Sequence, residues 1–246
     1  MVSRDIVTTI ASKDLRLFTT KTVVRLSIIL FPLVAAIGFS EVLSFAGDRG
    51  GGIPVTVLPH LLDAFLFFFV IGAALLPTSI ASYSLVGEKL ERSLEPLLAT
   101  PATDDEILLG KSLAAMVPPV VALWAGAVLF MVLSDGSTRP RLGRSYFPNG
   151  TAMLIVLVLI PLAAAFSVEL IVLISARVSD LRAAQQLGAL AVVPLAVVYV
   201  SAELDVVTLD APTLAVISGV LVLVDVGLFV IARTVFRREE ILTGWR

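Results

Sequence analysis

The sequence predicts an all-α polytopic membrane protein with six transmembrane helices, an N-terminal amphipathic interface helix, and a short helix in the loop between spans two and three. Of its 246 residues, 58% are hydrophobic and 15% are charged, whereas soluble domains average about 45–50% apolar and about 25% charged residues. Six apolar stretches approach the roughly 20 residues that a membrane span needs. This composition excludes a soluble globular domain, a disordered chain and a nucleic-acid-binding protein, and makes the lipid bilayer the expected surroundings.

Each apolar stretch is expected to be helical, because lipid offers the backbone no hydrogen-bond partner. Pro118-Pro119, Pro161 and Pro194 interrupt the apolar stretches of spans three, four and five. Such breaks can frame substrate sites, but membrane helices also tolerate proline structurally. The predicted spans cover about Val23–Phe45, Leu58–Leu85, Ile107–Leu133, Thr151–Ala176, Leu187–Ala202 and Pro212–Ala232.

The predicted organisation is an amphipathic helix in residues 1–22 followed by a transmembrane domain in residues 23–246, with a loop at 86–106 and a tail at 233–246. Of the 18 Lys and Arg residues, 14 fall in the N-terminal segment, around the loops after spans two and four, and in the tail. Basic residues accumulate on the cytoplasmic side of membrane proteins. Both termini and the loops after spans two and four are therefore expected in the cytoplasm. The lack of cysteine and of a eukaryotic targeting signal favours the plasma membrane of a prokaryote.

The chain has no cysteine and one histidine, His60. Disulfides, cysteine catalysis, iron–sulfur clusters and multi-histidine zinc sites are therefore excluded, and no cofactor is expected on this chain. An intramembrane enzyme would need a nucleophile with a base or a metal. His60, one helical step from Asp63 near the outer end of span two, supports that class poorly. Glu41 and Asp63 are interpreted as interfacial groups with access to water.

The N-terminal segment forms an amphipathic pattern over residues 4–20. At about 100° per residue, one half of the helical wheel collects Ile6, Leu17, Ile10, Val7, Phe18, Ala11 and Leu15. Asp14 and Arg4 intrude on this apolar side. Two interpretations stay open: a helix that lies on the inner leaflet, or one that also binds a cytosolic partner.

The loop after span two is the most informative stretch. Its leucines recur at helical spacing with charges between them: Leu90, Leu94, Leu97 and Leu98. Pro96 and Pro101 limit the length of this helix. Thr103 and Glu106 then form a Thr-x-x-Glu capping box that starts the next helix. A solvated interfacial loop is the simpler alternative.

The same stretch resembles the signature of type-2 ABC exporter permeases, usually Glu-Lys-Glu-Arg-x-Thr-Leu-Glu-x-Leu-Leu-x-Thr-Pro. The matching residues are Glu88-Lys89, Ser93-Leu94-Glu95-Pro96-Leu97-Leu98-Ala99-Thr100-Pro101, Glu106 and Gly110-Lys111. The chain departs from the pattern at Leu90 and Glu91 and carries Ser93 in place of threonine. Two shorter stretches, Ser175–Gln186 and Phe236–Thr243, resemble the same family.

The resemblance implies that a cytosolic ABC ATPase binds this loop as a coupling helix, together with the N-terminal helix. It also implies two ATPase copies, which carry ATP and Mg²⁺, and two membrane subunits as a homodimer or a paralogue heterodimer. The residues expected at the ATPase contact are Glu88, Lys89, Glu91, Arg92, Leu94, Glu95, Leu97 and Leu98. Together with Asp104, Asp105, Glu106 and Lys111, these residues carry more acidic than basic side chains. This excess of negative charge would complement a binding socket on the ATPase that has a basic rim.

Gly110-Lys111-Ser112 resembles only the end of a phosphate-binding loop. That motif needs a glycine at the position of Asp105 and a preceding strand. The chain therefore shows no ATP site of its own, and the resemblance implies a transport subunit rather than an enzyme.

Two carboxylates are predicted inside the membrane, where ionisable groups suggest function. Glu169 precedes Arg177 by eight residues, and Asp225 precedes Arg233 by eight. At about 1.5 Å per residue, both lie roughly 12 Å inward from the cytoplasmic boundary. They could share a proton, bind a cation or meet a cationic substrate, or each could simply bond a neighbouring helix. The alternative function is a secondary transporter driven by an ion gradient through this pair.

Overall fold

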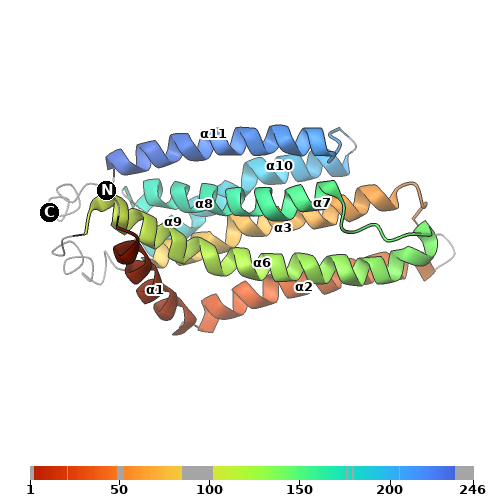
Figure 1. The fold of residues 1–246 in the computed structure, drawn as a ribbon, viewed down its shortest axis with the longest axis horizontal. Coiled ribbons are helices and arrows are strands. Elements are labelled where there is room, and N and C mark those ends of the chain that lie inside the picture. Colours follow the sequence, from red (N-terminus) through yellow and green to blue (C-terminus); the bar gives the residue numbers. More distant parts are fainter. Residues whose placement is uncertain are drawn as a thin grey trace.

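The computed structural model describes residues 3–20, 22–48, 53–84, 102–175, 177–178, 180–204 and 206–235. Within these ranges every regular element is helical, and six segments are long and apolar enough to cross a membrane. The prediction of an all-α polytopic membrane protein with six spans is therefore confirmed. The helices form an elongated bundle in which the start of α1 and the end of α11 lie at the same end (Figure 1). We call this the terminal end.

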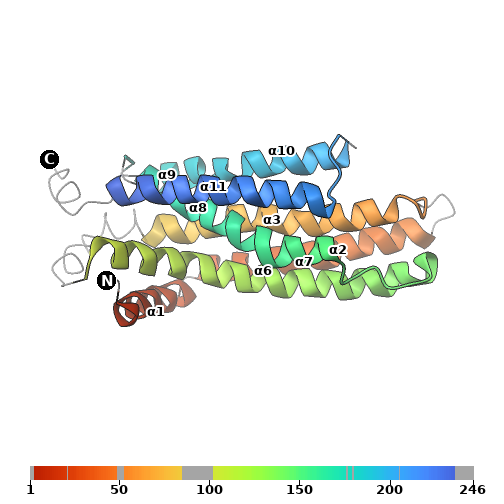
Figure 2. The same ribbon diagram turned by 45° about the horizontal axis from the view of Figure 1, so that its top comes forward.

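The helix bounds lie within three residues of the prediction for spans one, two, four and six, whereas span three ends later and span five begins earlier than predicted. The elements are α1 (Arg4–Thr20), α2 (Thr22–Asp48), α3 (Leu58–Ser82), α6 (Asp104–Leu142), α7 (Gly150–Leu154), a π-helical stretch (Ile155–Leu159), α8 (Ile160–Ser175), α9 (Leu181–Gly188), a 3-10 turn (Ala189–Ala191), α10 (Val192–Glu203) and α11 (Ala211–Val235). α2 to α11 run along the bundle, whereas α1 lies obliquely beside α6 at the terminal end (Figures 1 and 2).

Span two, α3, lies at the centre of the bundle. It packs against α2, α6, α8 and α10, and its Phe67 and Phe69 side chains are fully buried. The peripheral helices α2, α10 and α11 instead expose valine, leucine and isoleucine side chains on their outer faces. This distribution is the one expected when the outer faces meet lipid.

Helix α6 is continuous from Asp104 to Leu142 through Pro118 and Pro119, so the proline pair does not break span three and is tolerated within the helix, the second of the two interpretations. In an apolar environment, opening the helix would leave more backbone groups unpaired than the two hydrogen bonds that the prolines remove. The 39 residues of α6 extend about 58 Å at about 1.5 Å per residue, which exceeds the roughly 30 Å hydrocarbon core. Arg139 and Arg141 lie in its last turn, on a helical extension rather than in a loop.

Pro161 does interrupt span four, which is π-helical from Ile155 to Leu159 just before it. In this stretch the Ile160 N–H donates to the Ile155 carbonyl, five residues back. The next bond in that register would join residue 161 to the Val156 carbonyl, but proline has no N–H. The Trp124 indole of α6 donates to that carbonyl instead, at 2.7 Å, so a neighbouring helix replaces the missing bond.

Span five is also interrupted, by the 3-10 turn at Ala189–Ala191 ahead of Pro194. Its helical region begins earlier than predicted, because α9 starts at Leu181. The Asp180 side chain caps α9 by accepting from the Ala183 N–H at 2.9 Å. The sequence pattern missed this start because Leu181–Gly188 is amphipathic rather than uniformly apolar.

Candidate functional site

The apolar side of α1 packs against the first turns of α6. Val7 and Ile10 are buried, and the contact centres on Gly110 of α6. A Cβ atom at position 110 would lie 2.9 Å from both Cβ and Cγ2 of Ile10. Glycine therefore permits the close approach of the two helices.

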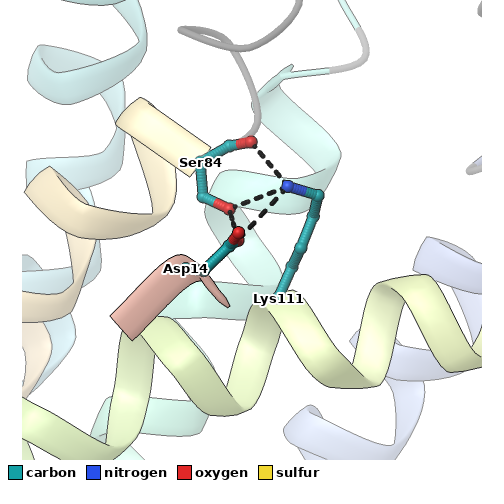
Figure 3. Close-up of polar contacts among 3 residues, drawn as sticks. All are labelled: Asp14, Ser84 and Lys111. Carbon is teal, nitrogen blue, oxygen red and sulfur yellow. Dashed lines mark hydrogen bonds and ion pairs between the residues drawn. The ribbon is translucent and has the colours of Figure 1, made fainter. Parts of the chain in front are cut away.

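One turn further along α1, a buried polar cluster joins three elements (Figure 3). The Lys111 Nζ of α6 donates to Asp14 Oδ2 of α1 at 3.3 Å, and to the backbone oxygen and Oγ of Ser84 at 3.1 and 3.2 Å. Ser84 Oγ donates to Asp14 Oδ2 at 2.8 Å. All three residues are at most 2% exposed.

The sequence pattern placed Lys111 in the charged set at the ATPase contact and did not predict its pairing with Asp14 and Ser84. The available signal was Asp14 on the apolar side of the N-terminal helix, together with Lys111 directly after Gly110. A buried charge is tolerated only with a partner and hydrogen bonds. Ser84 directly precedes the segment between α3 and α6, and Lys111 lies seven residues into α6, so the cluster ties the end of span two and the start of span three to α1.

The start of α6 carries the predicted Thr-x-x-Glu capping box, which is confirmed. The Glu106 N–H donates to Thr103 Oγ1 at 3.3 Å, and the Thr103 N–H donates to Glu106 Oε2 at 2.8 Å. The other carboxylate oxygen, Oε1, accepts from the Ser3 N–H at 2.6 Å. Glu106 thus caps α6 and holds the beginning of α1.

A second link at the terminal end joins α11 to α6. The Arg233 guanidinium donates to both carboxylate oxygens of Asp105, with 2.7 Å between Nε and Oδ1. The pair is partly exposed. Helices α1, α3, α6 and α11 are therefore connected by polar contacts around the loop between α3 and α6.

The predicted ATPase-contact residues from Glu88 to Leu98 lie outside the described residues. Within the described part of the same stretch, Glu106 and Lys111 are 3% and 2% exposed, and Asp105 pairs with Arg233. The expectation that Glu106 and Lys111 face a partner is therefore wrong, because both are buried within the bundle. Asp105 stays partly exposed in its pair with Arg233, so for this residue the ATPase contact remains a prediction. Gly110 and Lys111 lie inside α6 rather than in a loop ahead of it.

The two intramembrane carboxylates lie on neighbouring helices, Glu169 on α8 and Asp225 on α11. Asp225 is 8% exposed, and neither of its carboxylate oxygens has a hydrogen-bond partner in the described structure. Glu169 Oε2 is buried without a partner as well.

The opposite end of the bundle holds a separate polar cluster. The Tyr146 hydroxyl donates to Asp63 Oδ2 at 2.6 Å, and burial together with this carboxylate raises the pKa of the Tyr146 phenol. His60 Nε2 lies 2.8 Å from the Ala202 backbone oxygen, which joins α3 to the end of α10. No group of three or more His, Cys, Asp or Glu suited to a metal ion occurs among the residues described.

These features define a multi-pass membrane protein with polar contacts concentrated at the terminal end. A family model described as ABC-2 family transporter protein matches residues 8–208. The chain belongs to this family, and is a membrane permease of an ABC transporter. Family membership implies partnership with an ABC ATPase. None of the curated proteins compared with the chain matches it.

Proposed function

We propose that this chain is the membrane subunit of an ATP-driven ABC exporter in a prokaryotic plasma membrane. Two membrane subunits, either two copies or this chain and a paralogue, enclose the pathway. Two copies of a separate ATPase bind ATP and Mg²⁺ and face the terminal end, which lies in the cytoplasm. The observation that carries this proposal is the family match over residues 8–208.

The contacts at the terminal end support a mechanism for this function. The ATPase engages the loop between α3 and α6 and the exposed side of α1. When the ATPase subunits close on ATP, they displace this loop. The buried Asp14–Ser84–Lys111 cluster and the Glu106 contact to Ser3 make α1, α3 and α6 move together, because separating them would expose an unpaired charge.

The alternative, a secondary transporter, rests on Glu169 and Asp225 alone. Such a transporter would work without an ATPase, whereas the family match favours a partner ATPase. The two carboxylates are compatible with transport driven by ATP or by an ion gradient, because they could bind the transported substrate in either case.

The experiment is purification of the tagged chain from its own membrane, followed by measurement of ATP hydrolysis. The preparation is expected to contain an ABC ATPase, and hydrolysis is expected to disappear when that subunit is stripped away or its gene is deleted. Hydrolysis by the chain alone, or purification with no ABC ATPase, would contradict the proposal.

A further inference from the structure

A cavity of about 330 Å³ lies at the terminal end, between the last turns of α8 and α11 and the helix α9. It is lined by Leu173, Ile174, Arg177, Val178, Leu187 and Ile231. Five of these side chains are apolar, and the sixth is the cationic Arg177. The volume falls in the range of small-molecule pockets, about 300–1,000 Å³. The cavity therefore suits a ligand that combines an apolar part with a negative charge.

The backbone turn after α8 holds Arg177 at this cavity. The N–H groups of Arg177 and Val178 each donate to the Ile174 carbonyl oxygen at 3.0 Å. Arg177 is exposed, and its guanidinium forms no hydrogen bond or ion pair with another residue of the described ranges. Asp180, the next carboxylate along the chain, accepts from the Ala183 N–H as the cap of α9. The guanidinium is thus available for a phosphate group, which it can bind through two parallel hydrogen bonds.

The apolar walls of the cavity continue onto surfaces that are expected to meet lipid. Leu187 of α9 and Ile231 of α11 are exposed, and so are Leu190 and Val230 nearby in the chain. Arg177 lies two residues after the end of α8, where the apolar span ends and the lipid headgroups begin. A soluble anion would use the arginine alone, whereas a lipid would use both the arginine and the apolar walls.

We propose that this cavity binds an anionic phospholipid of the leaflet at the terminal end, with its phosphate on Arg177 and part of an acyl chain against Leu173, Leu187 and Ile231. Basic pockets between transmembrane helices are places where anionic headgroups bind, and the acyl chain gains van der Waals contacts with the apolar walls. The bound lipid contacts α8, α9 and α11 at once. This binding needs neither ATP nor an ATPase, so it is independent of the proposed transport function.

The test is lipid binding to the purified full chain in a non-ionic detergent, measured by native mass spectrometry as the affinity for the first bound lipid. Dioleoyl phosphatidylglycerol is the anionic probe. Dioleoyl phosphatidylcholine, with the same acyl chains and a zwitterionic headgroup, is the ligand control, and glycerol 3-phosphate is a soluble competitor without an acyl chain. Arg177→Gln removes the positive charge, and Arg177→Lys keeps it. Arg182→Gln is the matched control, because Arg182 is an exposed arginine on α9 that does not line the cavity.

The unchanged chain is expected to bind phosphatidylglycerol more tightly than phosphatidylcholine. Arg177→Gln is expected to weaken phosphatidylglycerol binding about fivefold, the effect of one basic residue near anionic headgroups. Arg177→Lys should lose less than this, and Arg182→Gln should stay close to the unchanged chain.

Equal affinity of the unchanged chain for the two lipids would overturn the proposal. An equal loss in Arg177→Gln and Arg182→Gln would also overturn it, because it would show a general attraction to surface charge. Displacement of the lipid by glycerol 3-phosphate at matched concentration would overturn it as well, since the site would then recognise a phosphate alone. Because no ATPase is present, each result leaves the ATP-driven function to its own test.

Discussion

Asp14 of α1 and Lys111 of α6 form a buried salt bridge of 3.3 Å across 97 residues of sequence, and each side chain is 2% exposed. The pair forms a polar cluster with Ser84, which lies just beyond α3. The N-terminal helix is thereby attached to spans two and three through charge as well as through apolar packing. Its attachment can be tested one partner at a time.

Replacement of one partner, by Asp14→Leu or Lys111→Met, is expected to destabilise the protein by about 3–5 kcal/mol, because the other charge stays buried without compensation. The double variant is expected to recover much of this loss. Thermal unfolding in nanodiscs measures the effect, with the exposed Lys13→Met as control. Additive losses in the double variant would show that the two side chains do not stabilise each other.

Gly110→Ala is expected to push α1 away from α6, since the new Cβ would lie 2.9 Å from Ile10. Protease cleavage within α1 should become faster. Gly136→Ala on the same helix is the control, because nothing lies within 4 Å of a Cβ there; alanine should stabilise that turn by up to about 1 kcal/mol. Equal cleavage rates in the two variants would contradict the close contact.

Trp124→Phe is expected to cost about 1 kcal/mol, the scale of hydrogen bonds between membrane helices, because the Val156 carbonyl loses its donor. In a Pro161→Ala background the cost should be smaller, since residue 161 then supplies an N–H of its own. A double-mutant cycle on unfolding measures this coupling. The same cost in both backgrounds would mean that the indole does not replace the proline N–H.

The six spans could be predicted from sequence because membrane insertion depends on length and apolarity, which need no knowledge of packing. The capping box at Thr103 and Glu106 was also predictable, because its partners lie three residues apart. The pairing of Asp14 with Lys111 was not, since it depends on how α1 crosses α6. A charge on the apolar side of a helix signals that a partner exists, but does not identify it.

The prolines differ in their effect on the helices for a similar reason. Pro161 and Pro194 coincide with changes of helix type, whereas Pro118 and Pro119 leave α6 continuous. The sequence alone shows that each proline lacks a backbone N–H and so cannot donate a helix hydrogen bond. Whether the helix then changes its hydrogen-bond register depends on the contacts with neighbouring helices. The placement of Glu169 and Asp225 on contacting helices likewise depends on the packing of α8 on α11, which matched depth alone did not provide.

The proposed orientation gives a labelling prediction. In intact cells, an impermeant thiol reagent is expected to label Thr208→Cys between α10 and α11, and to label Ser12→Cys on α1 only after lysis. Both native side chains are exposed, and the chain has no cysteine of its own to react. Labelling of Ser12→Cys but not Thr208→Cys in intact cells would reverse the orientation.

The central claim is that a separate ABC ATPase binds this chain at the loop between α3 and α6. The most direct measurement is the amount of ATPase that copurifies with Leu97→Ala compared with Glu91→Ala, at equal levels of membrane-inserted chain. Loss of a buried apolar anchor commonly costs more than about 2 kcal/mol, whereas charges at the rim of an interface cost less. Leu97→Ala is therefore expected to reduce ATPase association much more than Glu91→Ala. Equal and negligible effects of the two substitutions would contradict the account.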